Sequence, residues 1–486
     1  MPRRRFRLSS WLFALALSPG FMSLDSAHAV DEQGLPSLGN TSSVTTNEEY
    51  ELGRAWLRQF RAQAPQWNDP IVNDYLTSLI ARLAPHSQVS NLQTTIVLVD
   101  NRALNAFAVP GGVVGVNSGL FAFAEDEGSF VSVLAHELGH LSQRHYARNM
   151  ARAEQTQLPA MAAMLAGMLI AASGGGDAGL ATAMGSQAAF MQDRLSYSRR
   201  FEQEADRIGL QAMAAAGYDP EAMVRMFAAM QRMARLQGGN PPEFLLTHPV
   251  TESRLSDAQA RASQLNVAAT PRSDLLYDMM RARALAHIYR STPDQATVRM
   301  ERENAEETAL RYLSALTDAN RGNVDQALQT LDQLAVEQPD LALLPVSAAD
   351  IALNARRFDD AITRSQRQLR FMPNYLPAQM ILAEAQLQRD PQAAFDLLRR
   401  LTASQPENPQ GFNLLAEAAG RSGHDGWGHL ARAEYLQLTG NIDSGIRQLG
   451  IARSAAEREN DQLALARIEQ RRDDFIAYRE TMDKFR

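Results

Sequence analysis

The C-terminal half of the chain repeats itself with a period of 33 to 34 residues. In each unit an Asn or Asp turn precedes an alanine and several leucines, and a proline follows the leucines. The recurring positions are Ala327, Ala361 and Ala394, and Pro339, Pro373 and Pro406. A proline cannot continue a helix, so its regular return predicts paired helices of fixed length. The pattern therefore predicts an all-α solenoid, in which each unit buries its apolar face against its neighbours.

This period is that of the tetratricopeptide repeat. Stacked repeats leave a concave surface that binds peptides or proteins. With 486 residues the chain exceeds one compact core, so a separate domain precedes the repeats. We predict a signal peptide over residues 1–29, a zinc metalloprotease domain over 30–265 and a tetratricopeptide-repeat domain over 266–486.

The first 29 residues have the three parts of a cleavable export signal. Four arginines between Arg3 and Arg7 form the basic region, an apolar stretch from Trp11 to Leu17 follows, and Ala27-His28-Ala29 fits the cleavage pattern. The apolar stretch is shorter than the roughly 20 residues that a membrane span needs. We therefore expect a periplasmic protein without a permanent membrane anchor.

The charge and the cysteine content exclude two further classes of function and of metal ligand. The formal charge of −7 argues against a nucleic-acid-binding protein. No cysteine is present, so a metal would have to be bound through imidazole and carboxylate groups.

Before the repeats, the pattern changes from helical to extended and back. Helices are predicted over residues 50–62 and 70–83, and one longer helix over 125–148. The β-branched residues 94–99, and then 106–109 and 113–116 around Pro110-Gly111-Gly112, predict strands. The first domain should therefore be α+β with a small sheet, and the whole chain mainly α.

The longest predicted helix carries His136-Glu137-Leu138-Gly139-His140. Residues four apart lie on one face of a helix, so both imidazoles could bind one zinc ion. Glu137 points differently and can take a proton from a water held by the metal, whose pKa zinc lowers to about 7. This arrangement is typical of zinc proteases.

A catalytic zinc site needs a third protein ligand. Glu202 and Asp206 lie four residues apart on another predicted helix. We predict Glu202 as the third ligand, and Asp206 as the carboxylate that accepts an N–H from a ligand imidazole. Glu204 faces elsewhere on that helix and is a poor alternative.

These motifs resemble those of the HtpX-like and CAAX-prenyl-protease-like gluzincins. The resemblance includes the sequence from Asn105 to Gly112, and Thr247-His248-Pro249 with Arg254 downstream. With a signal peptide, no clear membrane spans and C-terminal repeats, the mature chain is similar to the BepA type of β-barrel assembly-enhancing proteases. This implies a periplasmic zinc endopeptidase that serves β-barrel assembly and degrades misassembled outer-membrane proteins.

The same resemblance implies roles for three further features. The strand after Gly111 would be the sheet edge that pairs with an extended substrate. His248 would lie near the zinc, either filling its open position as a latch or stabilising the oxyanion. Arg254 is the second oxyanion candidate. The implied partners are unfolded or misassembled outer-membrane proteins and, through the repeats, the β-barrel assembly machinery.

Some features keep more than one reading. The chain could be a repeat-based chaperone or scaffold with latent peptidase activity, although such a protein would not need Glu137. A zinc hydrolase of non-peptide amides is less compatible with a substrate-pairing strand. The Met-rich segment 158–190 is either a buried helical hairpin or a flap that contacts substrate or a membrane surface. We expect the remaining histidines to have structural roles only, namely His86, His145, His287, His424 and His429.

Overall fold

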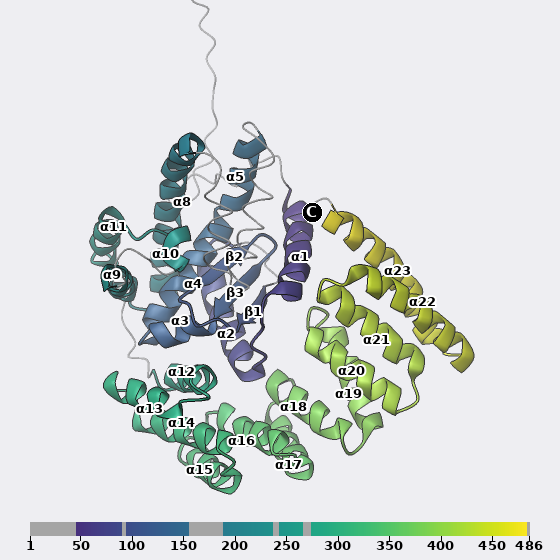
Figure 1. The fold of residues 1–486 in the computed structure, drawn as a ribbon. Coiled ribbons are helices and arrows are strands. Elements are labelled where there is room, and N and C mark those ends of the chain that lie inside the picture. The colour runs from purple at the N-terminus through teal and green to yellow at the C-terminus, as the bar shows by residue number, and fades with distance from the viewer. Residues whose placement is uncertain (1–44, 90–93, 155–187, 237–242, 266–273, 484–486) are drawn as a thin grey trace, which may run out of the picture. The chain divides into compact units, whose positions relative to one another are not determined.

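A computed structural model describes residues 45–89, 94–154, 188–236, 243–265 and 274–483 (Figure 1). The predicted signal peptide, most of segment 158–190 and the predicted domain boundary at residue 266 lie outside the described residues. The described residues belong to one compact unit. The fold is mainly α-helical with one three-stranded sheet, which confirms the predicted class. Within the described residues, no helix is long and apolar enough to cross a membrane.

The sheet consists of β1 (Thr95–Val99), β2 (Ala106–Val109) and β3 (Val113–Asn117) in the order β1-β3-β2. β1 runs parallel to β3, and β2 runs antiparallel to it. Gly111 and Gly112 both have positive φ angles, which suit the tight turn between β2 and β3. The expectation that the strand after Gly111 forms the sheet edge is wrong. Because β3 pairs with a strand on each side, the edge strands of the sheet are β1 and β2. The edge strand that the Gly111-Gly112 turn connects to β3 is β2.

The two faces of the sheet pack against different helices, as the alternation of side chains along a strand requires. On one face Leu98, Ala106, Val114 and Val116 join a core with α2 (Pro70–Leu83) and α4 (Glu127–Ser142). On the other, Val97, Val99, Val109 and Val113 pack on Trp56, Leu57 and Phe60 of α1 (Thr46–Gln63). The sheet therefore holds α4 on the face opposite to α1.

The other helices among the described residues before residue 266 are α3 (Ser118–Phe123), α5 (His145–Glu154), α8 (Ala188–Ala215), α9 (Glu221–Leu236), α10 (Glu243–Thr247) and α11 (Glu252–Ala262). The single helix predicted over 125–148 is in fact two helices. Arg144 adopts a left-handed conformation with a φ of 48° and pairs with Glu49 of α1 at 3.0 Å. A long-range ion pair, invisible in a local pattern, thus accompanies the break between α4 and α5.

Twelve helices follow within residues 274–483, and consecutive ones from α14 onward pack together. They are α12 (Leu275–Ile288), α13 (Pro293–Arg302), α14 (Glu307–Asn320), α15 (Val324–Glu337), α16 (Leu343–Asn354), α17 (Phe358–Phe371), α18 (Leu376–Leu387), α19 (Pro391–Ser404), α20 (Pro409–Arg421), α21 (Asp425–Leu438), α22 (Ile442–Glu459) and α23 (Gln462–Asp483). The repeated alanines Ala327, Ala361 and Ala394 occupy equivalent places in α15, α17 and α19 and are fully buried. The repeat seen in the sequence is therefore a repeat of helix pairs.

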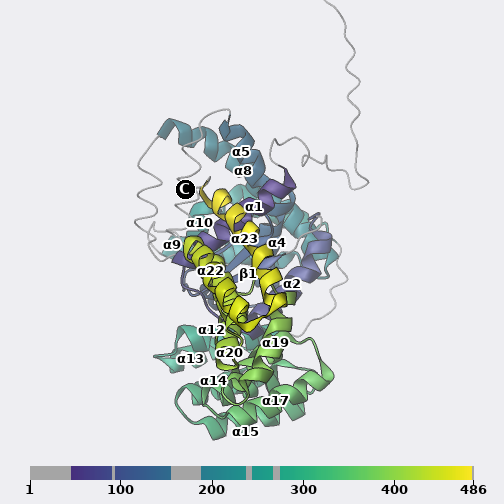
Figure 2. The same ribbon diagram turned by 90° about the vertical axis from the view of Figure 1, so that its right-hand side faces the viewer.

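Residues 274–483 contact the preceding helices and sheet region near their start, in the middle, where α18 packs against α2, and near their end. At the start, α12 packs against α3, and the Tyr277 hydroxyl donates to the Ala124 carbonyl at 2.8 Å. At the end, α21 and α23 lie beside α1 (Figures 1 and 2). There Arg58 donates from Nε to Gln437 Oε1 at 2.6 Å and stacks on the Tyr478 ring at 4.2 Å. Helix α1 therefore contacts both the sheet and the last helices of the chain.

Candidate metal centre

Helix α4 begins where Asp126 accepts a hydrogen bond from the backbone N–H of Ser129, which satisfies one free donor of the first turn. Its buried flanks carry it through the core, and it presents His136 and His140 one turn apart. A Cβ at Gly139 would lie 2.7 Å from the Ala205 carbonyl oxygen. Only glycine permits this approach, so Gly139 brings α8 and its carboxylates against α4.

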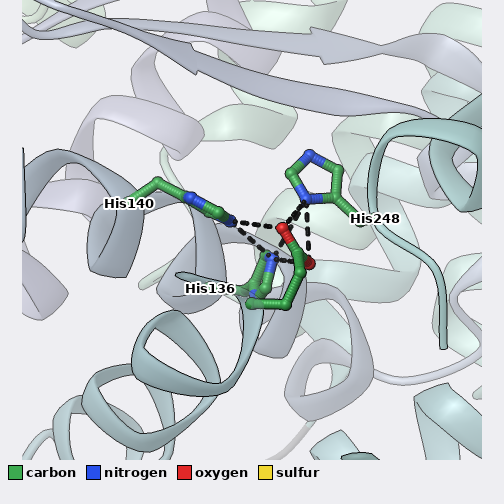
Figure 3. A group of neighbouring side chains, drawn as sticks. His136, His140 and His248 are labelled. Atoms are coloured by element: carbon green, nitrogen blue, oxygen red, sulfur yellow. Dashed lines mark hydrogen bonds and ion pairs between the residues drawn. The ribbon is translucent and has the colours of Figure 1, made fainter. Parts of the chain in front are cut away.

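The structure brings four side chains together, from α4, α8 and the end of α10 (Figure 3). One ligand atom from each of His136, His140, Glu202 and His248 lies within 4.8 Å of all the others. The Nε2 atoms of His136 and His140 are 3.0 Å apart, and each lies 3.3 Å from a carboxylate oxygen of Glu202. His248 Nδ1 lies 3.1 Å from Glu202 Oε1 and 3.3 Å from His136 Nε2.

These spacings fit zinc. Ligand atoms at 2.0–2.1 Å from a tetrahedral ion lie about 3.3 Å from one another. The donors are three imidazoles and one carboxylate, the groups that zinc accepts when no thiolate is present. The residues predicted as ligands therefore converge, and His248 offers a fourth donor atom.

The charges of the cluster favour a cation between the side chains. Burial opposes ionisation of Glu202, but the imidazoles of His248 and His140 outweigh it and hold its pKa well below the usual value. Burial lowers the pKa of His140. At His136 burial acts in the same direction, but Asp206 and Glu202 overcome it and raise the pKa to about 9. Without a metal ion, a protonated His136 supplies the positive charge in the cluster. A bound metal ion would take over that role.

Asp206 lies behind His136, with Oδ1 at 2.9 Å from the ring Nδ1. This is the position that the sequence predicted for it. Arg254 donates a hydrogen bond of 2.7 Å to each oxygen of Asp206. The same guanidinium donates to the Pro249 carbonyl at 2.8 Å and lies 2.9 Å from Glu202 Oε2. Contact of Arg254 with an oxyanion would require it to give up one of these bonds, so its geometry favours a role in holding the two carboxylates.

Glu137, the residue after His136, is buried. Its Oε1 accepts no hydrogen bond from the described residues, and His248 Nε2 lies 3.7 Å from it. A buried carboxylate oxygen without a donor is costly unless a water or substrate supplies one. Glu137 is therefore placed to accept a proton.

One part of the site, the contact behind His140, is not predicted by the sequence. His145, assigned to structure, lies with Nδ1 at 2.9 Å from His140 Nδ1 and with Nε2 at 3.0 Å from Glu204 Oε2. Burial lowers the pKa of His145 to about 3, so its ring is neutral. Glu204 is not among the clustered ligand atoms. No spacing rule could find this contact, because it needs the break at Arg144.

The remaining histidines do not join the cluster within the described residues. His287 pairs with Asp100 at the surface, His424 bonds to Gln392, and His429 accepts from Gln448. His86 ends a short 3₁₀ turn, Ala84–His86. These contacts are consistent with a structural role for the four histidines.

Comparison with known proteins agrees with the chemistry of the site. Residues 70–262 match the pattern of peptidase family M48, and this range contains all four clustered side chains. The β-barrel assembly-enhancing protease of Escherichia coli is 35% identical over 466 residues, which cover 94% of this chain and 93% of the relative. The protein of the same name from Yersinia pestis is 33% identical, and 93% of each chain is covered. The mitochondrial metalloendopeptidase OMA1 of Schizosaccharomyces pombe is 30% identical over 184 residues, 37% of this chain and 50% of the relative.

Proposed function

Because the chain belongs to the β-barrel assembly-enhancing proteases of peptidase family M48, we propose that this zinc metalloendopeptidase acts in the periplasm on outer-membrane β-barrel proteins. It degrades misassembled clients and assists the assembly of others in a chaperone-like way. The observation that carries the proposal is the convergence of His136, His140, Glu202 and His248 on one point in a chain that matches these relatives almost end to end.

His136, His140 and Glu202 hold the zinc ion in this proposal. Bound zinc is a Lewis acid, which polarises a peptide carbonyl and makes water acidic enough to react near neutral pH. Asp206 accepts the Nδ1 proton of His136, which leaves Nε2 free to bind the metal. Arg254 keeps Asp206 ionised and in place.

Glu137 is the general base. Its buried Oε1 has no donor among the described residues, so it is free to take a proton from the attacking water. The carboxylic acid that results can then pass the proton to the leaving amine nitrogen, which completes cleavage of the peptide bond.

The edge of β2 is the surface that binds the substrate backbone. Among the described residues β2 pairs only with β3, and it contacts α4, the helix that carries His136 and His140. An extended peptide added to this edge would form main-chain hydrogen bonds with β2 and would run past the metal site. This assignment replaces the one to β3.

His248 keeps two readings. Its Nδ1 lies at ligand spacing from both Glu202 and His136, which supports a latch that fills the fourth metal position. In that state the enzyme is latent until substrate displaces His248. This observation also favours the second candidate function, a repeat-based chaperone or scaffold with little peptidase activity. As an oxyanion donor, His248 would instead be needed for catalysis.

Whether the protein acts as a peptidase or as a scaffold, the helix pairs of residues 274–483 supply its binding surface. They act as tetratricopeptide repeats that contact unfolded clients and the β-barrel assembly machinery. Segment 158–190 is a further candidate for contact with substrate or a membrane surface, and residues 1–29 for the export signal.

The test uses one outer-membrane β-barrel protein in two forms, denatured and folded in detergent, with purified mature chain and zinc. We expect cleavage of the denatured form only, and loss of that cleavage with a metal chelator. If casein is cut but the denatured barrel is not, the protein is a peptidase with another client. If neither is cut while the denatured barrel still binds, the scaffold function is supported.

A further inference from the structure

The two metal-binding imidazoles of α4 are supported in different ways. Behind His136 lies a carboxylate, Asp206. Behind His140 lies a second imidazole, with His145 Nδ1 at 2.9 Å from His140 Nδ1. His145 Nε2 in turn lies 3.0 Å from Glu204 Oε2. His145 and Glu204 therefore lie on the Nδ1 side of His140, whereas its Nε2 faces Glu202 and the metal position.

The positions of the protons follow from this geometry. Two ring nitrogens 2.9 Å apart need one proton between them, because two lone pairs would repel. A metal on His140 Nε2 uses the lone pair of that nitrogen, so the neutral ring carries its proton on Nδ1 and donates it. His145 Nδ1 must then accept, which puts the His145 proton on Nε2, where it is donated to Glu204.

We propose that His145 and Glu204 are positioning residues, which hold His140 in the Nδ1–H tautomer and in the orientation that binds metal. The inference rests on the proposed function only in that His140 is taken as a ligand through Nε2. It adds to the site two residues that are not among the clustered ligand atoms.

Packing around His145 supports a defined ring orientation. The ring is buried and stacks on Phe201, with centroids 4.1 Å apart and planes inclined by 15°. Arg148 donates to the same Glu204 oxygen at 2.7 Å and lies over the other ring of the stack, Phe201, at 4.5 Å. Because the ring cannot turn freely, its Nδ1 lone pair stays directed at His140.

The arrangement also explains why the break at Arg144 matters. On a continuous helix, residues five apart differ by about 140° in direction, so His145 would point away from His140. The left-handed Arg144 redirects the chain, and His145, the first residue of α5, returns to the ligand. The ion pair of Arg144 with Glu49 thus supports the metal site from α1.

The test compares matched substitutions by zinc affinity, measured on the full mature chain against a competing chelator. His145→Leu removes the acceptor, whereas His145→Gln keeps a carbonyl oxygen of similar reach. Glu204→Leu and Glu204→Gln make the same comparison at the acceptor behind His145, because only the glutamine keeps an oxygen that can accept the His145 proton. Loss of such a partner lowers metal affinity about 10- to 100-fold, so we expect this loss in the leucine variants and recovery of most of it in the glutamine variants. The visible spectrum of the Co²⁺-substituted protein should change in the same order.

Equal affinities in the leucine and glutamine variants at both positions would overturn the inference. Thermal unfolding of the metal-free proteins separates this effect from a loss of folding. Should His145→Leu not fold, the Glu204 pair decides, since that side chain is 29% exposed and tolerates replacement. His140→Ala is measured alongside. If it retains zinc, the ligand assignment itself fails; if it loses zinc while the Leu and Gln variants match the parent, only the role of His145 and Glu204 fails.

Discussion

Arg254 and Asp206 form a buried two-point ion pair, with Arg254 Nε and one terminal nitrogen each 2.7 Å from a different oxygen of Asp206. The same guanidinium lies 2.9 Å from Glu202. One arginine on α11 thus neutralises two carboxylates of α8. The metal-binding groups of α4 and α8 therefore depend on a residue more than a hundred positions beyond the histidine motif.

Arg254→Met should destabilise the metal-free protein by about 3–5 kcal/mol, because it leaves two buried carboxylates without their cation. Urea unfolding in the presence of a chelator measures this, and saturating zinc should restore part of the loss. Arg235→Met is the matched control, since its pair with Glu252 is exposed on both sides and its loss should leave the midpoint unchanged. Similar midpoints for the two variants would contradict the role given to Arg254.

His140→Ala should remove the metal. The mature chain should carry one zinc ion, and elemental analysis of the variant should find far less than one, because two protein ligands hold zinc weakly even with His248 nearby. Full occupancy would exclude His140 from the site.

Glu137→Gln should keep the zinc but abolish peptidase activity. The amide has the size of the carboxyl group, yet it cannot accept a proton near neutral pH. Casein cleavage and metal content are measured on the same preparation. Cleavage at the parent rate would show that another group is the base.

His248→Ala separates the two readings of that residue by the sign of its effect. A latch predicts faster basal cleavage of casein, because the fourth metal position becomes free. An oxyanion donor predicts a fall of about 100-fold with zinc retained. The ligand spacing of His248 Nδ1 favours the first outcome.

Gly440→Ala should weaken the contact between α1 and the last helices. Gly440 has a φ of 80°, and a Cβ there would lie 2.7 Å from the Arg58 carbonyl oxygen and 2.8 Å from Ala62. Gly423 has the same φ with nothing within 4 Å, so Gly423→Ala carries the backbone strain alone. The difference in unfolding free energy between the two variants should be about 1–3 kcal/mol, the usual cost of overpacking. No difference would mean that the contact adds nothing to stability.

Local spacing explains most of what the sequence determined by itself. The interval of four between His136 and His140, and again between Glu202 and Asp206, places each pair on one helix face whatever surrounds it. The recurrence of Ala327, Ala361 and Ala394 likewise predicts equivalent buried positions, because each helix pair repeats the same packing. These inferences need only the helical period, which is a property of neighbouring residues.

The tertiary structure alone decided the remainder. Strand order made β2 rather than β3 the sheet edge, and order depends on which segments pair across the fold. The break at Arg144 turned His145 toward His140, and Glu49, 95 residues away in sequence, holds Arg144 by an ion pair. Arg254 pairs with Asp206 across 48 residues of sequence. Such contacts join segments that are distant in sequence, so their free energy depends on the packed fold, and no local pattern predicts them.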